Sequence, residues 1–153
     1  MELFLRQQPA EQAHSLEVFF QLIEQGEDSP DLLAAALLHD AGKSRFPLRL
    51  WERAEVVIGK ALFPAWVEKW GESGARGWKR PFVIAARHAQ WGAEMADEAG
   101  ASALTVRLIR RHQDSIGGKR GSAVPQRGDC DRDEILPGDE YLLQRLQVID
   151  NES

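Results

Sequence analysis

The sequence predicts an all-α fold, a single-domain helical bundle. Apolar residues recur at helical spacing along nearly the whole chain, several segments carry helix-capping residues at their ends, and no segment alternates convincingly as a strand. The chain has 153 residues, of which 43% are hydrophobic and 28% charged. These are ordinary values for one soluble domain with a buried core. We therefore treat residues 1–153 as a single domain.

The first predicted helix covers residues 10–26 and stops at Gly26, a residue typical of helix C-termini. Val18 and Leu22 follow His14 at helical spacing, on a face that should look inward. Other apolar residues also recur three and four positions apart and share one face. They are Leu16, Phe19, Phe20 and Ile23.

The second helix is predicted from "SPDLLAAALLHDAG", residues 29–42. Ser29 suits the N-cap, Pro30 the first helical position and Asp31 the positive end of the helix dipole. Gly42 marks the expected end. This helix is apolar on every side, so it should be buried, yet it runs into a histidine and an aspartate.

Four further helices are expected. Residues 48–70 form a helical stretch with Pro64 as a break, and residues 71–80 are expected to form a loop. Residues 81–100 predict a helix that bends near His88.

Ser102 is the expected N-cap of the next helix, in residues 102–114. Residues 115–138 are rich in Gly, Asp and Arg and predict a long polar loop. The last helix is expected in residues 139–150.

Six polar residues fall on, or at the edge of, faces that should look inward. They are His14, His39, Asp40, His88, His112 and Asp150, and they include all four histidines of the chain. Taken alone, each histidine is a hydrogen-bonded core residue more often than a ligand, and each aspartate a surface or capping group. Together, each would need its own buried partner, whereas two cations would satisfy all six. The pattern therefore favours a metal site, although it has neither zinc-finger nor HExxH spacing.

The order of these residues resembles the HD superfamily of metal-dependent phosphohydrolases, in which the ligands follow the order H…HD…H…H…D. The match includes "LLHDAGK", the HDxGK form of the motif, and "RHAQWGAEMADEAGASALTVRLIRRHQD". It extends from about residue 10 to the end of the chain. The resemblance implies a helical bundle of the HD-domain type with two divalent metal ions: manganese, magnesium, iron, nickel or zinc.

Roles follow from the resemblance residue by residue. Asp40 would bridge the two metals and serve in catalysis. The other protein ligands would be His14, His39 and Asp150 for one metal, and His88 and His112 for the other.

Lys43 follows the HD pair by one turn, so it could reach a substrate oxygen and take part in catalysis and substrate binding. The alternative is a lysine that only complements the end of a helix dipole. Arg111 is a weaker candidate for substrate binding. Other cations that could contact a phosphate are Arg45, Arg110, Lys119 and Arg120.

The resemblance to the HD-GYP subgroup, which hydrolyses cyclic di-GMP, is incomplete. That subgroup has a second histidine and a glutamate after the position of His112, followed by a GYP motif. Here Gln113 and Asp114 stand in those positions and no GYP motif follows. A third metal and cyclic di-GMP specificity are therefore not expected. The polar loop 115–138 could cover the site or form a surface excursion.

The leading functional hypothesis is hydrolysis of a phosphate ester, of a nucleotide or another small phosphorylated metabolite, by a water that two metals activate. One alternative is a mixed-valent di-iron oxygenase on the same ligand scaffold. Another is a non-catalytic, metal-bound sensor domain.

Composition limits the partners. A net charge of −5 gives no reason to expect nucleic-acid binding, and the run "LLAAALL" is far too short to span a membrane. A single cysteine, Cys130, and an amino terminus unlike a signal peptide predict a cytoplasmic protein.

Four tryptophans in the middle of the chain predict core packing or, alternatively, a homodimer face. They are Trp51, Trp66, Trp70 and Trp78.

Overall fold

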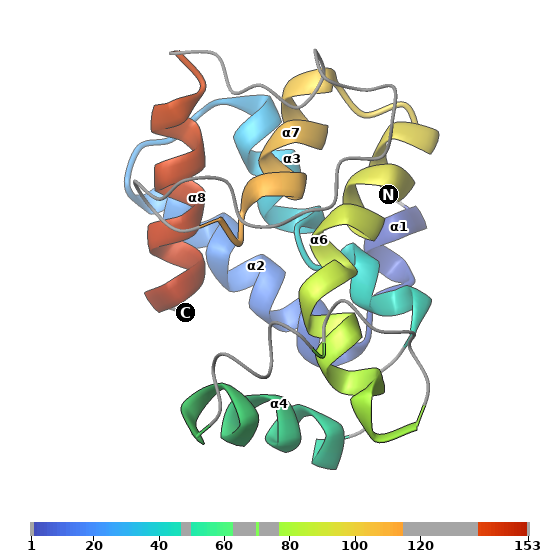
Figure 1. The fold of residues 1–153 in the computed structure, drawn as a ribbon. Coiled ribbons are helices and arrows are strands. Elements are labelled where there is room, and N and C mark those ends of the chain that lie inside the picture. Colours follow the sequence, from blue (N-terminus) through green and yellow to red (C-terminus); the bar gives the residue numbers. More distant parts are fainter. Residues whose placement is uncertain (1, 47–49, 63–69, 71–76, 115–137, 153) are drawn as a thin grey trace.

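The computed structural model describes residues 2–46, 50–62, 70, 77–114 and 138–152. In these ranges the regular structure is helical throughout and contains no strand, which confirms the predicted all-α class (Figure 1). The α-helices are α1 (Glu2–Leu5), α2 (Pro9–Glu24), α3 (Pro30–Leu38), α4 (Leu50–Leu62), α6 (Arg80–Glu98), α7 (Ala103–Arg111) and α8 (Glu140–Glu152). Two 3-10 helices, η1 (Ala41–Arg45) and η2 (Gly77–Lys79), precede α4 and α6.

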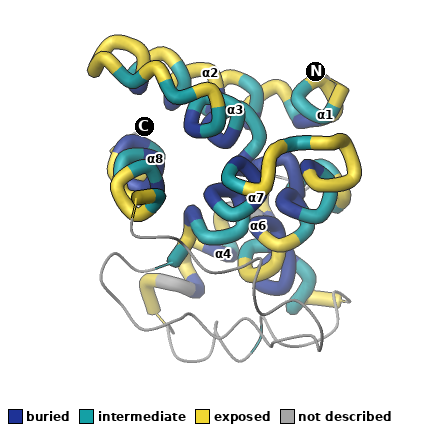
Figure 2. The backbone as a smooth tube through the Cα atoms, turned by 90° about the horizontal axis from the view of Figure 1, so that it is seen from above, coloured by how far each residue is buried: buried dark blue, intermediate teal, exposed yellow. Residues whose placement is uncertain are grey.

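Helix α3 lies at the centre of the bundle, where it contacts α1, α2, α7 and α8. Helix α6 packs against α7, α4 and η1. Apolar side chains from α2, α3, α6, α7 and α8 form one core, with Leu22, Leu32, Leu108 and Leu146 fully buried. Figure 2 shows buried residues concentrated in the inner helices and exposed residues along the outer side of α2. No helix in the described ranges is long and apolar enough to cross a membrane.

The predicted N-caps of α3 and α7 are confirmed. The Ser29 hydroxyl accepts a hydrogen bond from the Leu32 amide at 3.4 Å, and the Ser102 hydroxyl accepts one from the Thr105 amide at 3.0 Å. Both satisfy an amide at the start of a helix that would otherwise lack a partner. The Asp31 carboxylate accepts a hydrogen bond from the Thr105 hydroxyl at 3.0 Å, so the starts of the two helices are joined.

The inward face of α2 carries Val18 and Leu22, as expected from their spacing after His14, and both are fully buried. The other apolar face is not buried, since Leu16, Phe20 and Ile23 are 38%, 56% and 44% exposed. The buried residues of α2 are Glu11, Ser15, Val18 and Leu22. Both sets have helical spacing. The buried one contains two polar residues, whose burial depends on tertiary partners that hydrophobic periodicity does not reveal.

Helix α3 ends at Leu38 rather than at Gly42, and the chain continues as the 3-10 helix η1. Close packing of η1 on α6 explains the glycine. A Cβ on Gly42 would lie 1.9 Å from the carbonyl oxygen of His88 and 2.6 Å from the amide nitrogen of Gly92. Only a residue without a side chain allows this approach. The HD pair therefore lies at the junction of α3 and η1, directly against α6.

The expected helix in residues 48–70 is observed as α4, and its predicted break at Pro64 lies outside the described residues, as does Trp66. Helix α6 continues through His88 as one unbroken helix. Trp51 and Trp78 are 54% and 60% exposed, so the prediction that they pack in the core is wrong for these two residues. The Trp70 ring contacts Trp78 at a centroid distance of 4.9 Å. Most of the predicted polar loop, residues 115–137, also lies outside the described part of the chain.

Candidate metal centre

The fold brings together all six residues that the sequence singles out. His14 comes from α2, His88 from the middle of α6 and Asp150 from α8, while the others lie at or just beyond helix ends. They form two groups, and within each group one donor atom per residue lies within 4.8 Å of the others. The first group is His14, His39 and Asp150, and the second is Asp40, His88 and His112.

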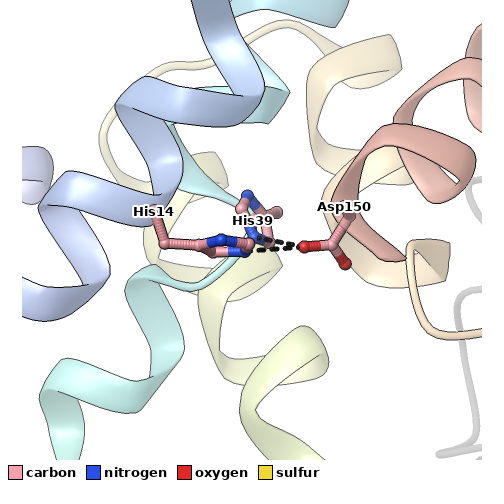
Figure 3. Close-up of side chains that lie close together, drawn as sticks. All are labelled: His14, His39 and Asp150. Carbon is pink, nitrogen blue, oxygen red and sulfur yellow. Dashed lines mark hydrogen bonds and ion pairs between the residues drawn. The ribbon is translucent and has the colours of Figure 1, made fainter. Parts of the chain in front are cut away.

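The first group is arranged around one carboxylate oxygen. Nε2 of His14 lies 2.8 Å from Oδ1 of Asp150, and Nε2 of His39 lies 3.1 Å from the same oxygen (Figure 3). His39 is fully buried, whereas the side chains of His14 and Asp150 are 28% and 21% exposed. Solvent therefore reaches this group from the side of α2 and α8.

The second group is buried on every side. Oδ1 of Asp40 lies 3.3 Å from Nε2 of His88. The His112 ring meets the His88 ring edge-on, with centroids 5.4 Å apart. None of the three residues is more than 4% exposed.

Asp40 faces both groups. Its Oδ1 points to His88, while its Oδ2 lies 3.7 Å from Nε2 of His39 in the first group. The two carboxylate oxygens of this side chain can therefore serve different cations.

Backbone carbonyls fix the orientation of three imidazole rings. Nδ1 of His39 donates to the Ala36 carbonyl at 2.8 Å, and Nδ1 of His112 donates to the Ile109 carbonyl at 2.7 Å. Nδ1 of His88 donates in the same way to carbonyls of its own helix, one of them at 3.0 Å. A carbonyl can only accept, so Nδ1 carries the proton, and a neutral ring presents a lone pair at Nε2. This is the arrangement of histidines that bind metals.

The buried Nε2 atoms of His39 and His88 test whether a cation fits. Neither makes a hydrogen bond, although each faces a carboxylate oxygen at 3.1–3.3 Å. A lone pair that faces a carboxylate oxygen at this distance is repulsive unless a positive charge lies between them. A divalent metal supplies that charge and accepts both donors, so the residues fit metal ions.

The two carboxylates are held ionised. Burial raises the pKa of Asp40, but the facing rings of His39 and His88 and the ammonium of Lys43 outweigh it and keep the pKa well below its usual range. Burial also raises the pKa of Asp150, but the hydrogen bond with His14 and the facing ring of His39 outweigh it, so this pKa is lowered too. Both groups therefore supply negative charge at neutral pH.

The pKa values of two buried histidines at the centre, His39 and His112, shift in opposite directions. Burial lowers the pKa of His39, but the facing Asp150 and Asp40 outweigh it and raise the pKa. For His112, burial and the nearby charges of His39 and His88 lower the pKa to about 3. His112 is therefore neutral at physiological pH, the form in which imidazole binds a metal.

Lys43 also lies at the centre. Its ammonium nitrogen is 2.5 Å from Oδ2 of Asp40, and its side chain is 31% exposed. Arg111, the weaker candidate, instead pairs with Asp114 through Nε at 2.7 Å. Arg45 pairs with Glu94 at 3.7 Å, whereas Lys119 and Arg120 lie outside the described residues.

The HD domain family model matches residues 12–150, which is nearly the whole chain. The chain belongs to the HD domain family. The resemblance drawn from the sequence is thereby confirmed, and the helical bundle is an HD-type fold. HD domains are mostly metal-dependent hydrolases that bind divalent metals. Membership of this family therefore supports the interpretation that the protein is an enzyme. No curated protein and no solved structure matches the sequence.

Sequence reasoning missed one residue beside this HD-domain centre. Gln147 on α8 is 3% exposed, and its amide nitrogen donates to the carbonyls of Arg111 and Asp114 at 3.0 and 2.8 Å. Its spacing from Leu143 and Asp150 places it on the inner face of α8. That spacing was the available signal, but it does not tell which partners a buried glutamine meets.

Proposed function

We propose that this HD-domain protein is a metal-dependent phosphohydrolase that acts on a phosphate ester of a nucleotide or another small phosphorylated metabolite. The observation that carries the proposal is the convergence of six histidine and aspartate donors in two groups that meet at Asp40. His14, His39 and Asp150 would hold one metal, His88 and His112 the other, and Asp40 would bind both.

Two divalent ions, when bound, would supply Lewis acidity that lowers the pKa of water and neutralises charge on a phosphoryl group. Manganese, magnesium, iron, nickel and zinc all suit this role and a ligand set of imidazoles and carboxylates. The protein's own contribution is orientation. The backbone carbonyls hold the rings of His39, His88 and His112 with Nε2 facing the centre.

Lys43 is the protein group best placed to contact a substrate. Its ammonium pairs with Asp40 at the centre, and its side chain is partly exposed. A turn of this side chain toward solvent would bring the ammonium to a phosphoryl oxygen of an arriving substrate. Arg111 would have to leave Asp114 to do the same, so it ranks behind Lys43.

The partner we propose is a small phosphorylated molecule rather than a nucleic acid, because the chain carries a net charge of −5. We further propose that residues 1–153 act as one domain in the cytoplasm.

A hydrolysis panel tests this proposal. It contains phosphomonoesters, phosphodiesters and nucleotides, each with manganese, magnesium, nickel or iron. Asp40→Asn is compared with Asp28→Asn, a matched change at an exposed aspartate before α3. We expect turnover in wild type and Asp28→Asn and loss of turnover in Asp40→Asn. Absence of turnover with every metal, in protein that carries two metals per chain, would contradict phosphoester hydrolysis and favour the oxygenase or the sensor.

A further inference from the structure

Helix α8 carries two buried or half-buried polar residues on its inner side, Gln147 and Asp150. They are three positions apart, so they lie on the same side of the helix within one turn. Asp150 belongs to the first metal-ligand group. Gln147 contacts the backbone on either side of His112, a residue of the second group.

The contact of Gln147 fastens the turn that follows α7. Helix α7 ends at Arg111, whose carbonyl already accepts a hydrogen bond from the Asp114 amide at 3.0 Å. The side-chain amide of Gln147 donates to the same carbonyl and to the Asp114 carbonyl, so it ties α8 to both ends of the turn. A side-chain amide has two N–H donors, enough for both carbonyls at once.

We propose that Gln147 is a positioning residue that sets the two metal-ligand groups at their working separation. It fixes the backbone turn that carries His112, and it does so from the same face of α8 that carries Asp150. The inference rests on the proposed two-metal site. It assigns to Gln147 no contact with substrate or metal.

Other contacts hold α8 in place independently. Nε of Arg145 lies 2.6 Å from a Glu27 carboxylate oxygen, and a guanidinium nitrogen of Arg107 lies 2.7 Å from the carboxylate of Asp139, just before the helix. These pairs anchor the first half of α8, whereas Gln147 and the fully buried Leu146 and Ile149 anchor the half that carries Asp150. Loss of the amide should therefore leave the fold intact and alter the geometry of the metal centre.

The test compares Gln147→Met with Gln144→Met. Methionine has a similar length to glutamine but no N–H donor, and Gln144 is an exposed residue of the same helix. Mn²⁺ is the probe. Calorimetric titration gives the number and affinity of bound ions, and electron paramagnetic resonance shows whether the two Mn²⁺ spins are coupled. Circular dichroism checks the fold.

We expect wild type and Gln144→Met to bind two Mn²⁺ with coupled spins. Folded Gln147→Met should bind one Mn²⁺ at least about tenfold more weakly, or lose the spin coupling. Unchanged affinity and coupling in that variant would overturn the inference and leave the proposed function standing. Fewer than two Mn²⁺ in wild type would instead overturn the two-metal proposal.

A second variant, Gln147→Leu, removes both donors without adding a charge against the two carbonyls or one turn from Asp150. The same change in affinity or coupling is expected. Failure of both Gln147 variants to fold would also contradict the inference, since the other anchors of α8 should suffice for folding.

Discussion

Replacement of Gly42 by alanine should damage both the fold and the metal centre. The new Cβ would lie 1.9 Å from the carbonyl oxygen of His88 and 2.6 Å from the amide nitrogen of Gly92. Real Cβ atoms stay at least 3.0 Å from such neighbours, so η1 and α6 would have to separate by about 1 Å. Both atoms belong to the backbone of α6, which cannot rotate away as a side chain would.

The expected cost follows from this overlap. Overpacking of a tight core typically costs about 1–3 kcal/mol, and a clash of backbone with backbone lies at the upper end, so we expect about 3 kcal/mol or more. In a chain of this size that corresponds to a fall in Tm of about 6–12 °C. The separation also moves Asp40 away from His88, which are 3.3 Å apart across the same contact. Metal affinity should therefore fall together with stability.

Urea unfolding of three glycine variants provides the assay. A Cβ on Gly138 meets nothing within 4 Å, so Gly138→Ala should be neutral or slightly stabilising. On Gly92 the nearest atom would be 3.1 Å away, so Gly92→Ala should have an intermediate effect. Equal midpoints for Gly42→Ala and Gly138→Ala would refute the packing of η1 on α6 and the reason given for the glycine of the motif.

Three further predictions concern charged groups. Lys43→Met leaves the buried Asp40 carboxylate without its ammonium partner, so the metal-free protein should lose about 2–3 kcal/mol of stability in urea unfolding. Saturating Mn²⁺ should remove most of the difference between the variant and wild type. An equal difference with and without Mn²⁺ would contradict this prediction. His14→Gln removes one donor of the first group only, so calorimetry should show one Mn²⁺ site weakened and the other retained. A hydrogen bond from Tyr141 and the adjacent Arg145 lower the pKa of Glu27 from its ordinary value of 4.5. The ionised Glu27 therefore stabilises the fold above that pH, and this stabilisation is lost as the pH falls through the folded-state pKa. Wild type should therefore be more stable than Glu27→Gln at pH 7, with the difference vanishing in acid; a difference that persists in acid would contradict the prediction.

Features that depend on local sequence could be predicted from it. Ser29 and Ser102 act as N-caps because their partners are three residues away on the same helix. Family membership also followed from the sequence, since the order and types of the ligand candidates are written in it.

Features that depend on tertiary contact could not be predicted in the same way. The buried face of α2 includes Glu11 and Ser15, which no hydrophobicity pattern places inside. Gly42 was expected only to end a helix, although its real constraint is the backbone of α6. Gln147 was overlooked because its partners are carbonyls of α7 and of the turn beyond it, more than thirty residues away in the sequence.

The most direct test of the two-metal centre is the number of Mn²⁺ ions bound per chain after equilibrium dialysis, measured by elemental analysis. Two ions are expected for wild type and for Asp28→Asn. Asp40→Asn should lose both or hold them loosely, because Asp40 faces both groups. Full and equal metal content in Asp40→Asn, or no bound metal in wild type, would contradict the assignment of Asp40 as the residue where the two groups meet.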